Sequence, residues 1–332
     1  MRSLVLTGAL IGTMLVAACG TAISTPLPAT VKLTVGLGYI SNIQFAQFYR
    51  AQQQGYYRDN GLDVTFQNEI DPNLITLVGQ GAVDIGLADG TSVIPAVGQG
   101  IPIKFVGTIY NKFPNVVMAP AAGSIKTAAD LKGHSLGIPG RYGSSWVALQ
   151  ALLGSVGLTT DDITVKEYPD YGQASALQQG QVDSATGFAN NEPVQLAQNG
   201  FATTQLTIDE IVPLPGPGLI VGANTLAAKH DAIQRFINET VRAMQEIEQN
   251  PELGLDDTIA AVPELGSDRA GQLAVLNATI KMWAGPDTNQ HGIAWVDTDA
   301  WSKSLEFMRT LPDQHVPATL TVNDLVTQEF SQ

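Results

Sequence analysis

The sequence predicts an α/β fold with mixed, largely parallel sheets, and two observations predict it. Short β-branched segments alternate with segments of helical periodicity along most of the chain, as they do where strands are joined by helical crossovers. A Gly-x-Val-Asp segment also occurs twice, at 81–84 and 180–183, each time between a short predicted helix and a predicted strand. The repetition indicates two units of one topology, with a crevice at the carboxyl ends of their strands.

The first unit begins with a predicted strand at 31–37, a β-branched run between Pro28 and Gly38. Aromatic residues at helical spacing predict a helix over 43–57, which Gly55 ends. A short helix opens at Pro72, because proline suits the first helical turn, and ends at Gly79 or Gly81. Further strands are predicted at 62–66, 84–88, 103–109 and 116–119, and a helix ends near Gly100.

A second set repeats this order. A capped single turn is predicted at 127–133, strands at 135–138, 163–168 and 183–188, and helices at 145–153, at 173–179 and before Gly200. After the Pro- and Gly-rich stretch at 213–218, the chain becomes mainly helical. Three helices follow from apolar spacing: one through Ile233, Phe236, Ile237, Val241, Met244 and Ile247, one through Leu273, Leu276, Ile280 and Trp283, and one through Trp301, Leu305 and Met308.

The amino terminus has the pattern of an export signal. Arg2 precedes an apolar run over 4–16 that is too short for a stable membrane span, and small residues lead to Cys19, the only cysteine. This arrangement resembles the bacterial lipobox, which implies cleavage before Cys19 and a lipid anchor on its thiol. The alternative is an ordinary signal peptide with an incidental cysteine. We therefore expect a signal peptide at 1–18 and a flexible tether at 19–30.

Composition limits the partners and cofactors. The 17 Lys and Arg against 31 Asp and Glu give a formal net charge of −14, without basic clusters, which speaks against nucleic acid and anionic membrane surfaces. With Cys19 consumed, disulfides and thiolate metal sites are excluded. The four histidines are scattered without metal-ligand spacing, so no metal and no cofactor are expected. About 310 residues would remain after cleavage, enough for two domains.

Several motifs carry a resemblance to a known family. They are Gly38-Tyr39-Ile40-Ser41-Asn42 with the following aromatic helix, Gly55-Tyr56-Tyr57, Asn60-Gly61-Leu62-Asp63-Val64, Ala129-Asp130-Leu131-Lys132-Gly133, Gly180-x-Val182-Asp183, and Gly187-Phe188-Ala189-Asn190-Asn191-Glu192-Pro193. Together they resemble the solute-binding proteins of ABC importers, in the group that includes nitrate, sulfonate and thiamine-pyrimidine binders. Within this group the first loop and the Asn-Asn-Glu-Pro segment look most like the binders of pyrimidine precursors and of riboflavin.

The resemblance implies a two-lobe periplasmic-binding-protein fold of type II, hinged at two crossover segments near 118–123 and 217–222. Lobe one would comprise 31–118 and 223–332, and lobe two 119–222. Such a protein binds a small molecule, closes on it, and delivers it to an ABC permease and ATPase complex. We expect a lipid-anchored monomer on the extracytoplasmic face of the cell membrane.

Candidate ligand contacts in lobe one follow two predicted strands. Tyr39 and Asn42 lie in the loop after the first strand, and Asp89 and Thr91 follow the strand at 84–88. Each polar residue has an alternative as a helix cap, and Phe45 favours the core.

Candidate contacts in lobe two lie at two predicted helix starts, where backbone N–H groups can donate hydrogen bonds to ligand oxygens. The first set is Tyr142, Ser144, Ser145 and Trp146, at the position where the sulfonate binders of this group hold their anion. Arg141 precedes it, either in the site or as a solvated charge. The second set is Phe188, Asn190, Asn191 and Glu192, which also suit helix capping. Aromatic residues gather in the predicted loops: Tyr39, Tyr110, Tyr142, Trp146, Tyr171 and Phe188.

Three classes of ligand remain open. Amides, loop aromatics and few cations favour riboflavin or a similar neutral heterocycle over the formylated aminopyrimidine of thiamine salvage, with a sulfonate or nitrate third. An enzyme like the pyrimidine-precursor synthases is the alternative of another class. Their cysteine-rich segment, which the resemblance implies for catalysis, has no counterpart here, and no nucleophile elbow or phosphate-binding loop is present. We therefore expect a binding protein.

Overall fold

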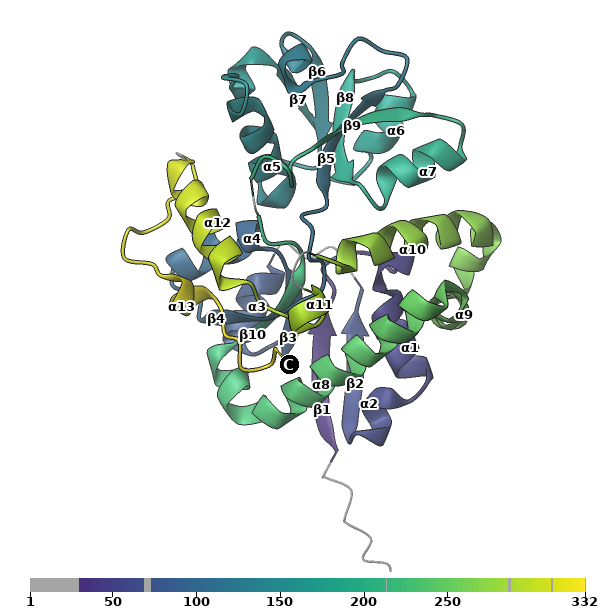
Figure 1. Ribbon diagram of the computed structural model, residues 1–332, viewed down its shortest axis with the longest axis vertical. Helices are drawn as coiled ribbons and strands as arrows, with labels where there is room; N and C mark the ends of the chain where they lie inside the picture. Colours follow the sequence, from purple (N-terminus) through teal and green to yellow (C-terminus); the bar gives the residue numbers. More distant parts are fainter. Residues whose placement is uncertain (1–29, 69–72, 213, 286–287, 312, 332) are drawn as a thin grey trace, which may run out of the picture.

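The computed structural model describes residues 30–68, 73–212, 214–285, 288–311 and 313–331 of the 332-residue chain. The expected signal peptide, Cys19 and the helix start at Pro72 lie outside these residues. Two sheets, each with its own helices, are stacked along the long axis of the molecule (Figure 1). We call the unit on the first sheet the first lobe, and the unit on the second sheet the second lobe.

The first sheet has the strand order β2-β1-β3-β10-β4. Strand β1 is parallel to β2 and β3, whereas β10 is antiparallel to both β3 and β4. Four of the five strands therefore point the same way, as predicted. The strands are β1 (Val31–Gly36), β2 (Leu62–Gln67), β3 (Ile85–Ala88), β4 (Ile103–Thr108) and β10 (Gly218–Gly222).

The second sheet repeats this arrangement in the order β7-β6-β8-β5-β9. Strand β6 is parallel to β7 and β8, and β5 is antiparallel to β8 and β9. In each sheet, the single antiparallel strand is the one that arrives from the other lobe. The strands are β5 (Asn115–Pro120), β6 (Ser135–Ile138), β7 (Thr164–Glu167), β8 (Ser184–Phe188) and β9 (Thr203–Thr207).

The repeated Gly-x-Val-Asp segment has the same role in both lobes. The Asp84 carboxylate accepts the backbone N–H of Thr34 on β1 at 2.9 Å, and the Asp183 carboxylate accepts the backbone N–H of Ser135 on β6 at 2.8 Å. Each aspartate thus fastens the strand that follows it, β3 or β8, to the parallel neighbouring strand, β1 or β6. The shared topology expected from the repetition is confirmed.

The chain passes between the sheets earlier than expected. It crosses once between Thr108 and Asn115 and again between Thr207 and Gly218. The crossovers expected at 118–123 and 217–222 are therefore wrong in position, because those segments contain the end of β5 and the whole of β10. An apolar β-branched run predicts a strand, but it does not say which sheet the strand joins.

Helices cover both lobes, and the three long predicted helices correspond to α8, α10 and α12. The first lobe carries η1 (Ile43–Phe45), α1 (Ala46–Gln53), α2 (Tyr56–Asp59), α3 (Leu74–Gln80), α4 (Gly90–Gly98), α8 (Ala223–Gln249), α9 (Pro251–Ala261), η4 (Pro263–Asp268), α10 (Arg269–Trp283), α11 (Thr288–His291), α12 (Thr298–Thr310) and α13 (Val322–Leu325). The second carries η2 (Ala128–Leu131), α5 (Gly143–Gly154), η3 (Thr160–Asp162), α6 (Gln173–Gln178) and α7 (Glu192–Gln198).

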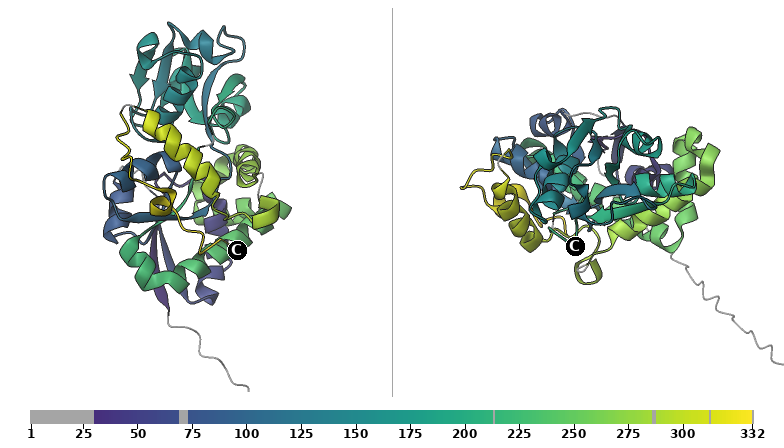
Figure 2. Two further views of the ribbon diagram at one scale, coloured as in Figure 1. Left: turned by 60° about the vertical axis from the view of Figure 1, so that its left-hand side comes forward. Right: turned by 90° about the horizontal axis from the view of Figure 1, so that it is seen from above.

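The lobes meet on both sides of the sheets (Figures 1 and 2). Helix α10 of the first lobe contacts α7 of the second, on the right in Figure 1, and α4 contacts α5 on the left. One apolar core continues from α5 of the second lobe into α4 and α12 of the first. Helix packing thus holds the facing ends of the two sheets close together.

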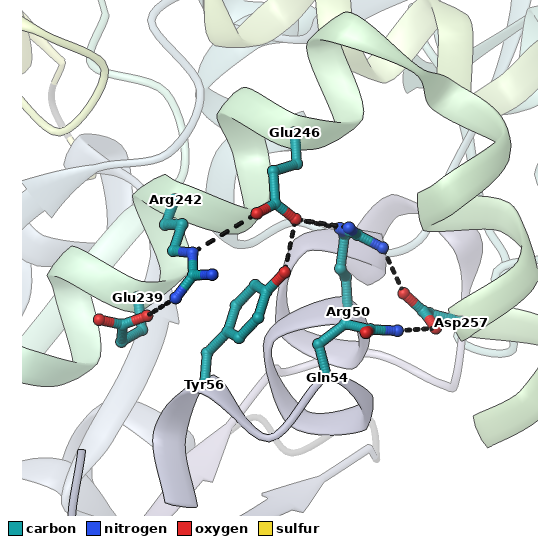
Figure 3. A network of polar contacts seen from close by, with 7 residues as sticks. All are labelled: Arg50, Gln54, Tyr56, Glu239, Arg242, Glu246 and Asp257. Carbon is teal, nitrogen blue, oxygen red and sulfur yellow. Dashed lines mark hydrogen bonds and ion pairs between the residues drawn. The ribbon is translucent and has the colours of Figure 1, made fainter. Parts of the chain in front are cut away.

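Arg50 joins four helices of the first lobe (Figure 3). Its side chain is 9% exposed. The guanidinium donates from Nε to Glu246 at 2.8 Å and from Nη1 to Asp257 at 2.7 Å, and the Tyr56 hydroxyl donates to the same Glu246 oxygen. Arg242 lies over the Tyr56 ring at 3.8 Å from its centroid. These contacts stabilise the packing of α1 and α2 against α8 and α9.

No helix within the described residues is long and apolar enough to cross a membrane.

Candidate ligand cavity between the lobes

A cavity of about 310 Å³ lies between the two lobes, within the range of small-molecule sites. It is lined by the loops that follow β1, β3, β6 and β8, so both lobes contribute the carboxyl ends of their strands. This is the position predicted from the α/β pattern. The apolar part of the wall, which no local sequence pattern indicates, includes Leu37, Leu74, Ile75, Leu87, Pro139 and Pro217.

Most of the expected contact residues lie in the cavity wall. From the first lobe they are Tyr39 and Asp89, and from the second lobe Tyr142, Ser144, Ser145, Phe188, Asn191 and Glu192. Tyr142 is nevertheless 55% exposed, so it stands at the rim. The local reason is shared: each residue lies in the stretch from the last residue of a strand to the first turn of the following helix.

Asn42 and Thr91 do not line the cavity. The Asn42 side chain caps η1 by accepting the backbone N–H of Gln44 at 3.0 Å, which is the alternative that the sequence left open. Thr91 is buried below Asp89 and donates its hydroxyl to that carboxylate. Gln44, two residues after Asn42, and Ser92, the residue after Thr91, line the cavity instead.

Trp146 and Asn190 also lie outside the cavity wall. Trp146 is 6% exposed and donates its indole N–H to Asp313 of the first lobe at 2.7 Å. The guanidinium carbon of Arg141 is 5.3 Å from the Trp146 ring centroid, and its Nε donates to Glu167, so this cation too lies outside the wall.

Asn190 is fully buried at the contact between the lobes. Its amide Nδ2 donates to Gln44 Oε1 and Thr279 Oγ1, both at 2.9 Å, and lies 3.3 Å from the Tyr110 hydroxyl. The three partners belong to η1, to α10 and to the segment between β4 and β5. Asn190 therefore joins the second lobe to the first beside the crossover, which no local sequence pattern indicates.

Aromatic rings from both lobes face the cavity. Tyr39 of the first lobe and Tyr171 of the second form an edge-to-face pair, with centroids 5.5 Å apart and an angle of 70° between the rings. Tyr171 adopts a left-handed backbone conformation (φ 59°), which is uncommon for a non-glycine residue. Tyr171 and Tyr110 were among the loop aromatics of the sequence, but only the structure places them in the wall. Phe45, expected in the core, contributes to both core and wall.

The charged groups of the wall are carboxyls. Asp89 of the first lobe and Glu192 of the second line the cavity, and burial raises the pKa of each. Burial and the nearby Glu192 raise the pKa of Tyr39 to about 12. Among the described residues of the wall, none is Lys, Arg or His. The arrangement favours a ligand that donates hydrogen bonds and carries no negative charge.

No group of His, Cys, Asp and Glu within the described residues has an arrangement that would hold a metal ion.

Comparisons with known proteins agree with this architecture. The family described as NMT1/THI5 like matches residues 42–253. The riboflavin-binding protein RibY of Chloroflexus aurantiacus is 33% identical over 309 residues, which cover 91% of this chain and 87% of that protein. The 4-amino-5-hydroxymethyl-2-methylpyrimidine phosphate synthase of Aspergillus parasiticus is 24% identical over 253 residues, 72% of this chain and 73% of the synthase.

Solved structures show the fold. The alkanesulfonate-binding protein SsuA of Xanthomonas axonopodis pv. citri, bound to MOPS, superposes with a TM-score of 0.70 at 18% identity, covering 90% of this chain and 99% of that one. The Candida albicans CA3427 gene product, described as having the generic periplasmic binding protein fold, gives a TM-score of 0.68 at 17% identity, covering 91% and 98%. The expected two-lobe periplasmic-binding-protein architecture is confirmed.

Proposed function

The chain belongs to the NMT1/THI5-like family, and from this premise we propose that it is the solute-binding protein of an ABC importer that captures riboflavin. Its similarity to RibY extends over nearly the whole of both chains, whereas the synthases match more distantly and over a shorter part. The proposal includes delivery to a permease and no catalysis.

The choice of riboflavin as the ligand rests on the aromatic residues of the cavity wall. Rings from both lobes, those of Tyr39 and Phe45 from the first and Tyr171 and Phe188 from the second, surround the space between the sheets. A planar tricyclic ring has poorly hydrated faces, and such walls favour it through area burial and offset or edge contacts. We propose that Asn191 and the carboxyl of Glu192 pair with the donors and acceptors on the pyrimidine-dione edge of the flavin.

The charge of the cavity wall distinguishes between the candidate ligands. A sulfonate or nitrate requires donors of positive charge, and the described wall offers carboxyls instead, so we place anions last. The formylated aminopyrimidine of thiamine salvage remains the second candidate, because it is uncharged, donates hydrogen bonds, and accords with the pyrimidine chemistry named for several relatives.

We further propose that the protein is held on the extracytoplasmic face of the membrane by lipid on Cys19. The support comes from the residues before this cysteine, a short apolar run followed by small residues. Two or more acyl chains anchor a protein stably, at about 0.8 kcal/mol per buried CH₂. The segment at 19–30 would then act as the tether between the lipid and β1.

Titration of riboflavin with refolded, ligand-free protein tests the proposal. Tyr and Trp rings in contact with a flavin quench its emission, so the fluorescence of riboflavin should fall saturably, and scattering should show a smaller radius for the complex. If riboflavin emission stays constant while the formylated aminopyrimidine gives a clear calorimetric signal, the pyrimidine precursor replaces riboflavin. Chemical alteration of the bound molecule would favour an enzyme.

A further inference from the structure

Asp89 occupies the start of helix α4 and faces the cavity. It is the N-cap of that helix, and its Oδ1 accepts the backbone N–H groups of Thr91 at 2.9 Å and of Ser92 at 3.1 Å. The Thr91 hydroxyl donates to the same oxygen. The residue is 9% exposed, and that exposed part lies in the cavity wall. Burial raises the pKa of this carboxyl, whereas the three donors and the dipole of α4 favour its ionised form and fix it in position.

The second lobe presents another helix start to the same cavity. Helix α5 is twelve residues long, and its first three residues, Gly143, Ser144 and Ser145, line the wall. Its N-cap residue, Tyr142, makes no side-chain capping bond. The free N–H groups and the helix dipole attract negative charge at this place.

Asp89 supplies that negative charge from the opposite lobe. Asp89 and Ser144 line the same cavity from opposite lobes, and helices α4 and α5 are in contact. The carboxyl therefore lies between two helix starts, one on each lobe. An anionic ligand at the start of α5 would lie beside this carboxyl, and no described residue of the wall brings a cation to offset the repulsion.

We propose that Asp89 is a specificity-determining residue that makes the cavity reject anions, by acting as a built-in anion at the start of α5. The inference rests on the proposed function, because it names the form of the ligand: the uncharged vitamin is accepted, and its phosphate ester is rejected. The second carboxyl of the wall belongs to Glu192, at the start of α7. It accepts the backbone N–H of Phe188 and is therefore held at a different helix start from α5.

The test compares riboflavin with riboflavin 5′-phosphate by fluorescence titration of the full chain. For the wild-type protein we expect the ester to bind at least tenfold more weakly than riboflavin, with a larger ratio at low ionic strength, where repulsion is less screened. Asp89→Asn and Asp89→Ser keep a good N-cap for α4 but remove the charge, so folding is retained. In both variants we expect the ratio of the two affinities to fall toward one and to lose its dependence on salt.

Glu192→Gln is the matched variant, because it removes the other carboxyl of the wall. Because Glu192 is proposed to pair with the ring edge that both flavins share, the variant should weaken the binding of both alike and leave the discrimination against the ester in place. Equal binding of the two flavins by the wild-type protein, unchanged selectivity in both Asp89 variants, or an equal loss of selectivity in Glu192→Gln would each overturn the role assigned to Asp89. Absence of riboflavin binding by the wild-type protein would instead overturn the proposed function itself.

Discussion

Trp146 on α5 and Asp313 after α12 join the two lobes at a point outside the cavity. The indole N–H donates to Asp313 Oδ2 at 2.7 Å, and Gln150, one turn further along α5, donates to the same oxygen at 3.0 Å. Asn190 joins the lobes by buried contacts to η1 and α10. A ligand between the lobes is retained by the contacts that hold them together, so residues outside the wall contribute to affinity.

Replacing Asp313 by Ala should weaken riboflavin binding about fivefold, the equivalent of about 1 kcal/mol, through faster dissociation. The variant removes the acceptor of two hydrogen bonds between the lobes and leaves the cavity wall unchanged. Stopped-flow fluorescence measures the dissociation rate. Glu306→Ala, on the exposed face of α12, is the control and should dissociate as the wild type does. Equal rates for all three proteins would show that the contact does not hold the lobes together.

The same contact should depend on pH. Partial burial alone would raise the pKa of Asp313, but the hydrogen bonds from Trp146 and Gln150 outweigh it and lower the pKa. The carboxylate therefore stabilises the contact above the ordinary pKa, about 3.9, and this stabilisation is lost as the pH falls through the lowered value. Riboflavin affinity, measured between pH 3 and 6, should decrease more steeply with acidification in the wild type than in Asp313→Asn. Identical profiles would exclude Asp313 as the source.

The ring pair across the cavity should contribute directly to binding. Tyr171→Ala removes one ring of the Tyr39–Tyr171 pair and should weaken riboflavin binding by about 1–3 kcal/mol. Tyr171→Phe keeps the ring and should retain most of the affinity, which isothermal calorimetry can measure. If both variants bind equally well, the ring of Tyr171 does not contact the flavin.

Arg50 should be needed for stability rather than for binding. Arg50→Met leaves the carboxylates of Glu246 and Asp257 without their cation (Figure 3) and should lower the free energy of unfolding by about 3 kcal/mol. Arg58→Met removes an exposed arginine that pairs with Asp59, and should change stability by less than about 1 kcal/mol. Urea unfolding curves compare the two. Similar midpoints would mean that the network is not stabilising.

Cys19→Ala tests the proposed lipid anchor. The variant lacks the thiol that would carry the lipid, so we expect release of the protein from membranes or accumulation of an uncleaved precursor. Fractionation of expressing cells, followed by mass determination of the mature amino terminus, provides the measurement. Unchanged membrane retention together with unchanged processing would remove the lipoprotein proposal.

Local sequence patterns predicted most of the secondary structure. The turn at Gly55 follows from its left-handed backbone (φ 75°), which ends the first helical segment as expected. The capping box of Thr127 and Asp130 starts η2 at the predicted place. Helix α9 and the strands β9 and β10 were not anticipated. Strand β10 lies directly after a Pro- and Gly-rich stretch, and only its pairing with β3 and β4 makes it a strand.

The sequence also predicted part of the cavity wall, but not the contacts between the lobes. Residues between the end of a strand and the first turn of the next helix, such as Tyr39, Asp89 and Ser144, could be selected because that position is set by the local order of elements. Trp146 occupies the same kind of position, yet it faces Asp313, which is 167 residues away along the chain. A pattern confined to neighbours in sequence contains no information about such a partner.

The sequence by itself determined the α/β class, the repeated unit and the strand ends at which the cavity forms, because periodicity and capping are local properties of the chain. Only the tertiary structure decided which strands cross between the sheets, that Asn190 and Trp146 join the lobes, and that Asp89 faces the start of α5. These relationships depend on how two sheets, formed by different parts of the chain, meet. That meeting is set by the packing of α4, α10 and α12 against the second lobe, over separations that no local pattern spans.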